Sequence, residues 1–350
     1  MTTYRVTTKP VGIGVMGTGW VATARHIPAF KRDRRARIVA VFDRDDAKAK
    51  NVARQFKAPQ HSNNLDDFLR TPIAAVAICT PPMTHAEAIE AALQAGKHVL
   101  VEKPMTLTAN EGRALEALAN EKGLLLCPSH NFLFSHSVRK VEALLRNGEA
   151  GTVQWAMGIQ LSSWRRRLPT WYGTLPGGLF FDEAPHLLYL MQRFLGHLEV
   201  EHAWQTTPKD QSQSLSERVE ARLAGAYGAG YLTMWSGAPL SEWLFVLCCS
   251  RAVLVIDLFR DILVHLPPEK AHNASDVLGV TINGTSQAWH GVWSSGVRLI
   301  RRRQFYGHDR LVQAFLDSVV DGTPSPTTAQ DGWQVVGIME SILHHASQRE

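Results

Sequence analysis

Residues 11–22 read VGIGVMGTGWVA, in which an apolar strand runs into a glycine-rich turn and then into a stretch that can open a helix. A dinucleotide-binding turn needs a strand before its glycines and a helix after them. Only GTGWVA, residues 17–22, meets both conditions, because the earlier match that begins at Gly12 follows Pro10 and has no strand before it. We therefore expect four residues of this turn to contact a dinucleotide: Gly17, Gly19, Trp20 and Val21.

The first 127 residues alternate between apolar strands and helices. After the first strand, further strands are predicted at Ile38–Phe42, Ala74–Cys79, His98–Val101 and Leu124–Cys127. Two of the helices between them carry capping-box and glycine-stop signals: Thr84, Glu87 and Gly96 for one, Thr108, Glu111 and Gly123 for the other. Continuous apolar strands that alternate with helices are typical of a buried parallel sheet. The pattern predicts a doubly wound sheet for residues 1–127.

Polar residues follow these strands at the edge where the carboxyl ends lie, which is where open parallel sheets bind ligands. Asp43 follows the second strand, and its carboxylate can accept hydrogen bonds from an adenosine ribose. The alternative is an acidic residue that opens the next helix, at Asp45 or Asp46. Lys103, within Glu102-Lys103-Pro104, follows another strand, and the bond before its proline is a candidate for the cis form. A lysine opposite a phosphate-binding turn indicates an enzyme that holds a dinucleotide and moves a proton.

From residue 128 onward the pattern changes to alternating polar and apolar residues. Strands are expected at Thr152–Gln160, Arg218–Leu223, Tyr231–Trp235, Leu244–Cys249, Ala252–Leu258 and Ile262–Leu266, and helices at Val138–Arg146, Asp309–Val320 and Asp331–His345. Period-two alternation with short turns predicts a large, mostly antiparallel open sheet with one covered face. We expect residues 128–350 to form a second α/β domain for substrate binding and oligomerisation, whose C-terminal helices can pack back on the first.

Asp182 and His186 stand four residues apart, after the flexible pair Gly177–Gly178. A helix that begins near Asp182 places both side chains on one face, and Pro185 is tolerated in the first turn of that helix. The pair is a candidate acid–base couple. The alternative is a capping aspartate beside a half-buried histidine.

Six further residues are candidates for contact with a substrate: His130, Asn131, Trp164, Arg165, Trp171 and Tyr172. The first two follow the last strand of the parallel sheet. The others belong to SWRRR at residues 163–167 and to Trp171–Tyr172, where aromatic rings can stack on a sugar and arginines can bind a carboxylate or phosphate. The alternative is a solvated arginine run with tryptophans packed at an interface. Arg301–Arg303 is expected to be solvated or salt-bridged.

Length, charge and cysteine content exclude several classes of protein. A chain of 350 residues suggests two domains, and a net charge of +5 argues against nucleic acid as the main partner. The four cysteines lack metal or disulfide spacing, so no metal is expected. Met1–Arg5 lacks the apolar stretch of a signal peptide, and no window is apolar enough for a membrane span. We expect a cytoplasmic protein without a membrane partner.

With these motifs the chain resembles the glucose–fructose oxidoreductase, inositol dehydrogenase and MocA (Gfo/Idh/MocA) family of nicotinamide-dependent oxidoreductases. The resemblance rests on the glycine turn and on three further motifs: Cys79-Thr80-Pro81 with His85, Glu102-Lys103-Pro104, and Asp182 with His186. It implies a Rossmann domain, an α/β domain whose open sheet often forms an oligomer interface, and Lys103, Asp182 and His186 as the catalytic trio. Two residues depart from the family pattern: Ala184 stands where glycine is usual, and Glu183 where an apolar residue is common.

The resemblance implies an NAD(P)-dependent dehydrogenase that transfers hydride between nicotinamide and a secondary alcohol or ketone of a sugar, cyclitol or sugar acid. Lys103 is expected to hydrogen-bond the reacting oxygen, His186 to accept the proton, and Asp182 to orient substrate or histidine. The expected cofactor contacts are Gly17, Gly19, Trp20, Val21, Asp43, Arg44, Thr80, Pro81, His85, Glu102 and Lys103. NAD(H) is favoured because the Asp43 carboxylate would repel a 2′-phosphate, whereas Arg44 could pair with one and admit NADP(H).

Two rival functions stay open from the sequence. One is an NAD-dependent glycosidase or lyase, in which transient oxidation permits elimination without net cofactor turnover. The other is a non-catalytic protein that senses a dinucleotide. We expect a small carbohydrate-like substrate and a homodimer or homotetramer that assembles through the open sheet.

Overall fold

The structure is a computed structural model that describes residues 10–165, 168–206, 218–269, 271, 273–301 and 306–348. Met1–Arg5, Arg166, Arg167, Arg302 and Arg303, which carried expectations above, lie outside these residues. The chain forms two compact units, one of Met1–Asn131 with Gly307–Gly337 and one of Phe132–Tyr306 with Ile338–Glu350. Among the helices of the described residues, none is both long and apolar enough to cross a membrane.

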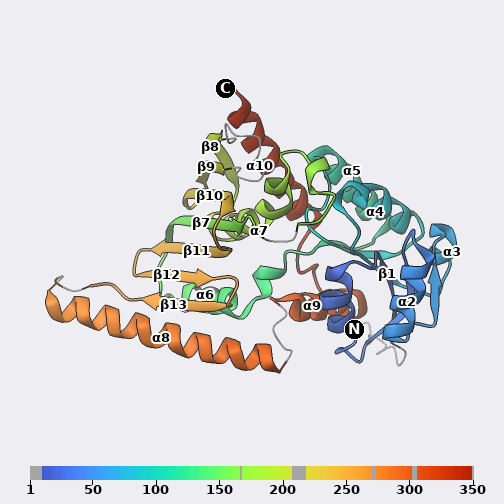
Figure 1. The fold of residues 1–350 in the computed structure, drawn as a ribbon, viewed down its shortest axis with the longest axis horizontal. Coiled ribbons are helices and arrows are strands. Elements are labelled where there is room, and N and C mark those ends of the chain that lie inside the picture. Colours follow the sequence, from blue (N-terminus) through green and yellow to red (C-terminus); the bar gives the residue numbers. More distant parts are fainter. Residues whose placement is uncertain are drawn as a thin grey trace, which may run out of the picture. The chain divides into compact units, whose positions relative to one another are not determined.

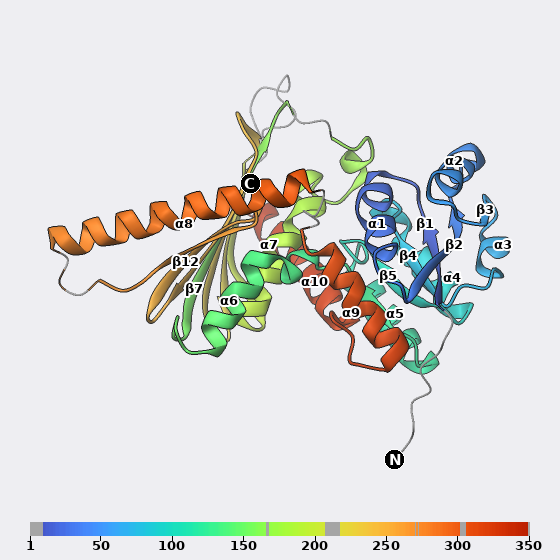
Figure 2. The same cartoon turned by 90° about the horizontal axis from the view of Figure 1, so that it is seen from below.

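Sheet A of the first unit has six parallel strands in the order β3-β2-β1-β4-β5-β6, of which Figure 2 labels β1 to β5. The strands are β1 (Val11–Met16), β2 (Ala36–Phe42), β3 (Gln60–Ser62), β4 (Ala75–Ile78), β5 (His98–Val101) and β6 (Leu126–Pro128). This is the strand order of the doubly wound dinucleotide-binding fold, and it confirms the predicted parallel sheet. The order reverses between β1 and β4, so the segments that follow these two strands flank the crevice at the switch point.

Among the described residues, seven helical segments lie wholly in the first unit besides short 3₁₀ turns. They are the π-helical turn η1 (Ala22–His26), α1 (Ile27–Phe30), α2 (Asp46–Phe56), α3 (Leu65–Leu69), α4 (His85–Gln94), α5 (Ala109–Lys122) and α9 (His308–Asp321). Buried side chains of α3, α4 and α5 form one continuous core with those of β1, β2, β4 and β5. Arg35, directly before β2, pairs with Asp317 of α9 at 2.6 Å, which connects this C-terminal helix to the rest of the first unit.

The two predicted capping boxes had different outcomes. Thr108 accepts from the Glu111 amide and the Glu111 side chain reaches back, so α5 begins with a capping box and ends at Gly123, as predicted. The capping box predicted at Thr84 is wrong. A 3₁₀ turn, η2 (Pro82–Thr84), precedes α4, and the Thr84 hydroxyl donates to the carbonyl of Pro81 at 2.9 Å instead.

Sheet B of the second unit has seven strands in the order β13-β12-β11-β7-β10-β9-β8 (Figure 1). The strands are β7 (Val153–Ser163), β8 (Leu198–Thr206), β9 (Arg218–Gly225), β10 (Gly228–Ala238), β11 (Glu242–Cys249), β12 (Ala252–Asp257) and β13 (Ile262–Leu266). Among the strands that the structure describes in this sheet, β7 and β10 alone pair in parallel, which confirms the mostly antiparallel sheet. Buried and half-buried residues alternate along β7 and β11, as expected for a sheet with one covered face. Strand β8 was not predicted.

The helices of the second unit are α6 (His136–Arg146), α7 (Leu179–Leu195) and α8 (Ala274–Ile300), and α10 (Ala329–Ser347) begins in the first unit and ends in the second. The 27-residue α8 was missed. Its sequence contains glycines, which disfavour helix. The structure gives one of them a reason, because a Cβ on Gly291 would lie 2.5 Å from Ile262 of the edge strand β13. Close packing against β13 therefore overrides the weak local preference.

Candidate active site

The glycine turn follows β1 directly, and the helix begins at Trp20, as the fingerprint requires. Gly17 has φ +91, and a Cβ there would lie 2.8 Å from the carbonyl carbon and oxygen of Cys79 at the end of β4. Gly19 is different, because its Cβ would meet no atom within 4 Å. One glycine thus lets two strands approach, and the other leaves open space at the helix N-terminus, where backbone amides favour a phosphate.

Asp43, after β2, holds this turn. Its carboxylate accepts from the Thr18 amide at 3.0 Å and from the Thr18 hydroxyl, and also from the Asp45 amide at 3.1 Å. Asp45, by contrast, caps α2 by accepting from the amide of Lys48. The helix-opening role thus belongs to Asp45, and Asp43 lies beside the crevice where a ribose would bind.

Two further predicted contacts of the turn reach solvent. Arg44 is exposed. Trp20 is 69% exposed and stacks against Arg25, whose guanidinium carbon is 4.8 Å from the ring centroid. Both side chains are therefore available to a ligand in the crevice.

The segment after β4 carries a buried hydroxyl that points to a ligand. The hydroxyl of Thr80 is buried and has no hydrogen-bond partner among the described residues. A Cβ added to Gly17 would lie 2.9 Å from the backbone nitrogen of Thr80, so Thr80 borders the glycine turn. A buried polar atom without a partner is costly, and a bound dinucleotide in the crevice would supply one.

His85 joins the segments that follow β4 and β5. Its ring is fully buried, with Nδ1 2.7 Å from the carbonyl oxygen of Pro104 and Nε2 2.9 Å from that of Thr80. Burial lowers the pKa of His85, and the two carbonyl partners oppose this effect. The Lys103–Pro104 peptide bond is cis, as the sequence suggested. His85 therefore links the segment that follows β4 to the segment that follows β5.

Glu102 lies in a buried cluster with His26 of η1 and His308 of α9. Its Oε1 is 2.6 Å from Nε2 of His26 and 3.7 Å from Nε2 of His308, and its Oε2 accepts from the Lys103 amide at 3.2 Å. Burial raises the pKa of Glu102, but hydrogen bonds and proximity to the two histidines outweigh burial and hold that pKa well below its usual range. Glu102 is therefore an ionised acceptor, and the His26 Nε2 donates to it.

His26, Glu102 and His308 each have one atom that could bind a metal ion, and these three atoms lie within 4.8 Å of one another. Their separation alone would therefore allow a metal site. Two ligands on one zinc ion, each about 2.0–2.2 Å from it, lie about 3 Å or more apart. The separation of Glu102 and His26 is 2.6 Å, a hydrogen-bond distance. The geometry is therefore that of a hydrogen-bonded cluster. Neither histidine was predicted from the sequence.

His130 and Asn131 follow β6 and are 2% and 3% exposed. Burial lowers the pKa of His130 to about 4, against the raising effect of the Asp331 and Glu102 carboxylates. This imidazole is therefore neutral at physiological pH. Contact of either residue with a substrate stays a prediction.

In the second unit, α7 presents Asp182 and His186 on one open face. Every residue from Leu179 to Met191 is buried except these two, which are half-buried. Residues four apart lie on the same side of a helix. The two side chains therefore share one face, and solvent reaches this face but not the other faces of this part of α7. This pattern supports the pair as a functional site.

The predicted start of this helix is wrong. It begins at Leu179, not near Asp182, so Pro185 lies inside it and not in its first turn. The reason is the pair Gly177–Gly178, whose φ values of +64 and +56 turn the chain into the helix earlier. Pro185 has no amide hydrogen to bond the carbonyl four residues before it, which usually breaks a helix. Here the helix continues through Pro185, which is buried.

Aromatic side chains flank the imidazole of His186. The rings of Phe132 and Trp243 each lie 5.0 Å from it between centroids. Its Nδ1 is 3.0 Å from the hydroxyl of Tyr189, one helical turn further along. That hydroxyl accepts from the Phe132 amide at 3.0 Å. Sequence inspection missed Tyr189, although its spacing of three from His186 was a visible signal.

Glu183, one of the two departures from the family pattern, is 4% exposed. It accepts hydrogen bonds from Gln160 and, at 2.9 Å, from Ser162, both on β7. Its carboxylate therefore bonds the helix to the sheet beneath it, and it points away from the open face that Asp182 and His186 share.

The aromatic and arginine candidates lie on a separate segment of the second unit. Trp164 is 53% exposed, and the Arg165 guanidinium carbon lies 4.6 Å from its ring centroid. Trp171 precedes a 3₁₀ turn, η4 (Tyr172–Thr174), that begins at Tyr172. All four side chains reach solvent at least in part, and their contact with a substrate stays a prediction.

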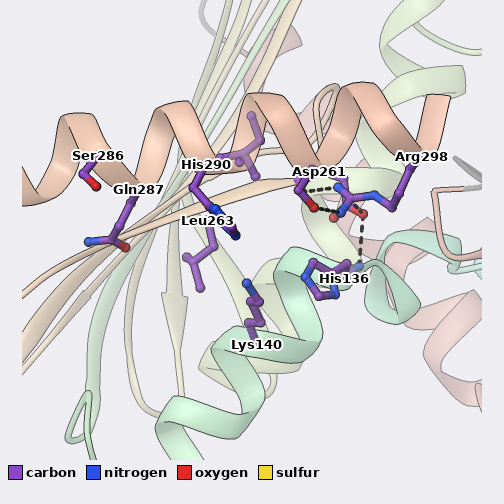
Figure 3. A pocket seen from close by; sticks show the side chains of 11 residues that line it. His136, Lys140, Asp261, Leu263, Ser286, Gln287, His290 and Arg298 are labelled. Atoms are coloured by element: carbon purple, nitrogen blue, oxygen red, sulfur yellow. Dashed lines mark hydrogen bonds and ion pairs between the residues drawn. The ribbon is translucent and has the colours of Figure 1, made fainter. Parts of the chain in front are cut away.

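A polar cavity of about 360 Å³ lies between α6, β13 and α8 (Figure 3). His136, Lys140 and His290 line it together with Arg298, which is 3.8 Å from Asp261. Asp261 also accepts from the first amides of α6. The Arg298 and Asp261 side chains therefore join α8 to the start of α6. None of these residues was a sequence candidate.

Comparison with known proteins identifies relatives of this chain. A family model described as "Oxidoreductase family, NAD-binding Rossmann fold" matches residues 11–130. A dTDP-3,4-didehydro-2,6-dideoxy-alpha-D-glucose 3-reductase of Saccharopolyspora spinosa is 34% identical over 260 residues, which cover 71% of this chain and 75% of that protein. An uncharacterized oxidoreductase of Synechocystis is 36% identical over 166 residues, which cover 46% of this chain and 44% of that protein. The chain thus spans less than half the length of this second relative.

A solved structure shares the fold along almost its whole length. GenD2 from gentamicin A biosynthesis, in complex with NAD, has a TM-score of 0.78 and 22% identity, and the match covers 98% of this chain and 96% of that chain. At this identity the likeness shows the fold alone.

Proposed function

Because the chain belongs to the Gfo/Idh/MocA oxidoreductase family with its NAD-binding Rossmann fold, we propose that it transfers hydride between nicotinamide and a secondary alcohol or ketone of a sugar, cyclitol or sugar acid. The comparisons confirm the predicted family, the oxidoreductase class and NAD(P) as the class of cofactor. The observation that carries the proposal is the glycine turn at the switch point of sheet A, with Lys103 placed after β5 of the same sheet.

The first unit has the features that a dinucleotide needs. Gly19 leaves open space at the start of a helix, Asp43 lies beside it, and the Thr80 hydroxyl is buried without a partner. When bound, the cofactor would supply hydride transfer at its nicotinamide. We propose that the turn binds the pyrophosphate through backbone amides and that Asp43 accepts hydrogen bonds from the adenosine ribose, which favours NAD(H) over NADP(H).

The protein's own task is to bind the reacting oxygen and move its proton. In the proposed mechanism Lys103 donates a hydrogen bond to that oxygen, His186 accepts the hydroxyl proton during oxidation and returns it during reduction, and Asp182 orients the substrate or the histidine. The open face of α7 supports this assignment for the second unit. That the three residues act together is part of the proposal.

A sugar-like substrate is supported by the relatives. The name of the Saccharopolyspora spinosa relative describes the reduction of a ketone on a nucleotide-linked deoxysugar. The exposed Trp164 and Arg165 pair in the second unit suits such a ligand, because an aromatic face can stack on a sugar and a guanidinium can bind a phosphate or carboxylate.

The test is a screen of sugars, cyclitols, sugar acids and nucleotide-linked sugars with either cofactor, followed by absorbance at 340 nm. Lys103→Met should lower turnover by about 10²–10⁴-fold while cofactor affinity stays near that of the wild type. Lys122→Met, at the exposed last turn of α5, is the matched control. Unchanged turnover in Lys103→Met would remove this lysine from the mechanism. Substrate cleavage without net cofactor reduction would point instead to the glycosidase or lyase reaction.

We also propose that the open face of sheet B forms the interface of a homodimer or homotetramer. Its half-buried side chains at the centre of the sheet are largely apolar: Trp155, Met157, Ile159, Leu161, Leu244 and Val246. A row of apolar side chains that solvent still reaches is the kind of surface that a protein interface covers.

A further inference from the structure

The hydroxyl oxygen of Tyr189 contacts both His186 and the backbone of Phe132. It is 2% exposed and is among the largest side chains that α7 buries. Its hydroxyl lies 3.0 Å from Nδ1 of His186 and 3.0 Å from the amide nitrogen of Phe132. The proposed proton acceptor is thus connected through one phenol to the segment that leads into α6.

The direction of one of these hydrogen bonds is fixed by chemistry. A backbone amide can only donate, so the Tyr189 oxygen accepts the hydrogen of Phe132. A hydroxyl oxygen has a second acceptor position, and Nδ1 of His186 is at the distance to use it. In a buried setting the amide of Phe132 keeps the phenol in one place, because losing that bond would leave the amide unpaired.

We propose that Tyr189 is a positioning residue for the proton transfer: its oxygen accepts the Nδ1 hydrogen of His186 and so holds the imidazole with Nε2 as the acceptor. This inference rests on the proposed function, in which His186 takes the substrate proton. The hydrogen bond made by one ring nitrogen decides which nitrogen carries the hydrogen. In the oxidation direction Nε2 gains the hydroxyl proton and in reduction it gives that proton back, while the other hydrogen stays on Nδ1 and remains hydrogen-bonded to the Tyr189 oxygen.

The direct test is nitrogen-15 NMR of the full-length protein labelled at histidine, without substrate. The signals of His186 are identified as those lost in His186→Gln. We expect the wild type above the pKa of the ring to show a protonated Nδ1 and an unprotonated Nε2, and Tyr189→Phe to lose this preference. A wild type with its hydrogen on Nε2, or a tautomer unchanged in Tyr189→Phe, would overturn the inference.

Kinetics provide a second readout. Tyr189→Phe keeps the ring and removes the oxygen, and we expect kcat to fall about 10–100-fold with little change in the KM of the cofactor. Tyr227→Phe, at a position 69% exposed, is the matched control and should retain wild-type kcat. A purely structural role would lower thermal stability without moving the tautomer. If the wild type shows the expected tautomer but oxidises no substrate in the screen, the positioning inference stands and the proposed function fails.

Discussion

Two glycines in the turn after β1 have different physical roles. Gly17 combines a left-handed backbone with a close approach to Cys79, whereas Gly19 faces open space. A side chain at the first position meets the backbone of β4, and one at the second meets only what occupies the crevice. The same turn thus contains a position needed for folding and a position needed for ligand binding.

Alanine at each position should separate these roles. Gly17→Ala should destabilise the first unit by about 1–3 kcal/mol, seen as a lower thermal midpoint by circular dichroism. Gly19→Ala should keep that midpoint and weaken cofactor binding, measured by quenching of tryptophan fluorescence. If both variants lost stability equally and bound cofactor alike, the division of roles would be wrong.

The negative charge of Asp43 is the reason to expect that the protein prefers NAD(H) to NADP(H). A carboxylate about 4 Å from a 2′-phosphate costs on the order of 4 kcal/mol per unit charge near a protein surface. Asp43→Asn keeps an acceptor for Thr18 and removes the charge, so affinity for NADPH should rise relative to NADH in parallel titrations. Asp46→Asn, on the exposed first turn of α2, is the control. Tighter binding of NADPH than NADH by the wild type would contradict this prediction.

Sequence alone indicates the residues that belong to motifs. Lys103, Asp182 and His186 were singled out by their place after a strand or by helical spacing. The partners of such residues depend on tertiary contacts, and these leave no local pattern. His26 and His308 contact Glu102 from distant parts of the chain, so only the folded structure identifies them.

At the scale of elements, the Glu102 cluster joins three segments of the first unit. The carboxylate follows β5, His26 belongs to η1 directly behind the glycine turn, and His308 begins α9. The helical turn η1, next to the glycine turn, is therefore connected through this cluster to the segment after β5 that contains Lys103. We expect this cluster to contribute to the stability of the first unit in a pH-dependent way.

The sign of that dependence follows from the depressed pKa of Glu102. The folded state holds the carboxylate ionised below the pKa of about 4.3 that the unfolded chain has. Its stabilisation is therefore fully present above the unfolded pKa and is lost as pH falls through the folded pKa. Glu102→Gln should lower the free energy of urea unfolding by about 1.5–3 kcal/mol at pH 7, and the difference from wild type should shrink below pH 4.

Glu87→Gln provides the comparison for this measurement, since Glu87 is exposed on α4. It should follow the wild type at every pH. A Glu102→Gln difference that stayed constant down to pH 3 would mean that the carboxylate does not titrate with a depressed pKa.

Element prediction failed where packing overrides local preference. Helix α8 was missed because its glycines disfavour helix in isolation, whereas contact with β13 requires a small residue at Gly291. The start of α7 was misplaced because Pro185 was given a first-turn position, and the two positive φ values before the helix move its start earlier. Strong local signals, such as the capping box at Thr108, were read correctly.

At the scale of the whole molecule, the fold class was predictable because both sheets repeat a short-range pattern. Continuous apolar strands indicated the parallel sheet, and alternating ones indicated the open antiparallel sheet. No such sequence pattern predicts that Gly307–Gly337 belongs to the first unit, because this depends on long-range contacts such as the ion pair of Arg35 and Asp317. Local periodicity therefore indicates layers, and long-range ion pairs and burial decide which segment joins them.

The open face of sheet B leads to a prediction about assembly. Val246 lies on β11, half-buried on the face that α7 does not cover. Val246→Asp would place like charges near one another in a symmetric interface, where they cost several kcal/mol, so the oligomer should dissociate in sedimentation velocity runs. Ile282→Asp, at a 59% exposed position of α8, is the control and should sediment as the wild type does. If Ile282→Asp dissociated the assembly and Val246→Asp left it intact, the interface would lie along α8 and not on the open sheet.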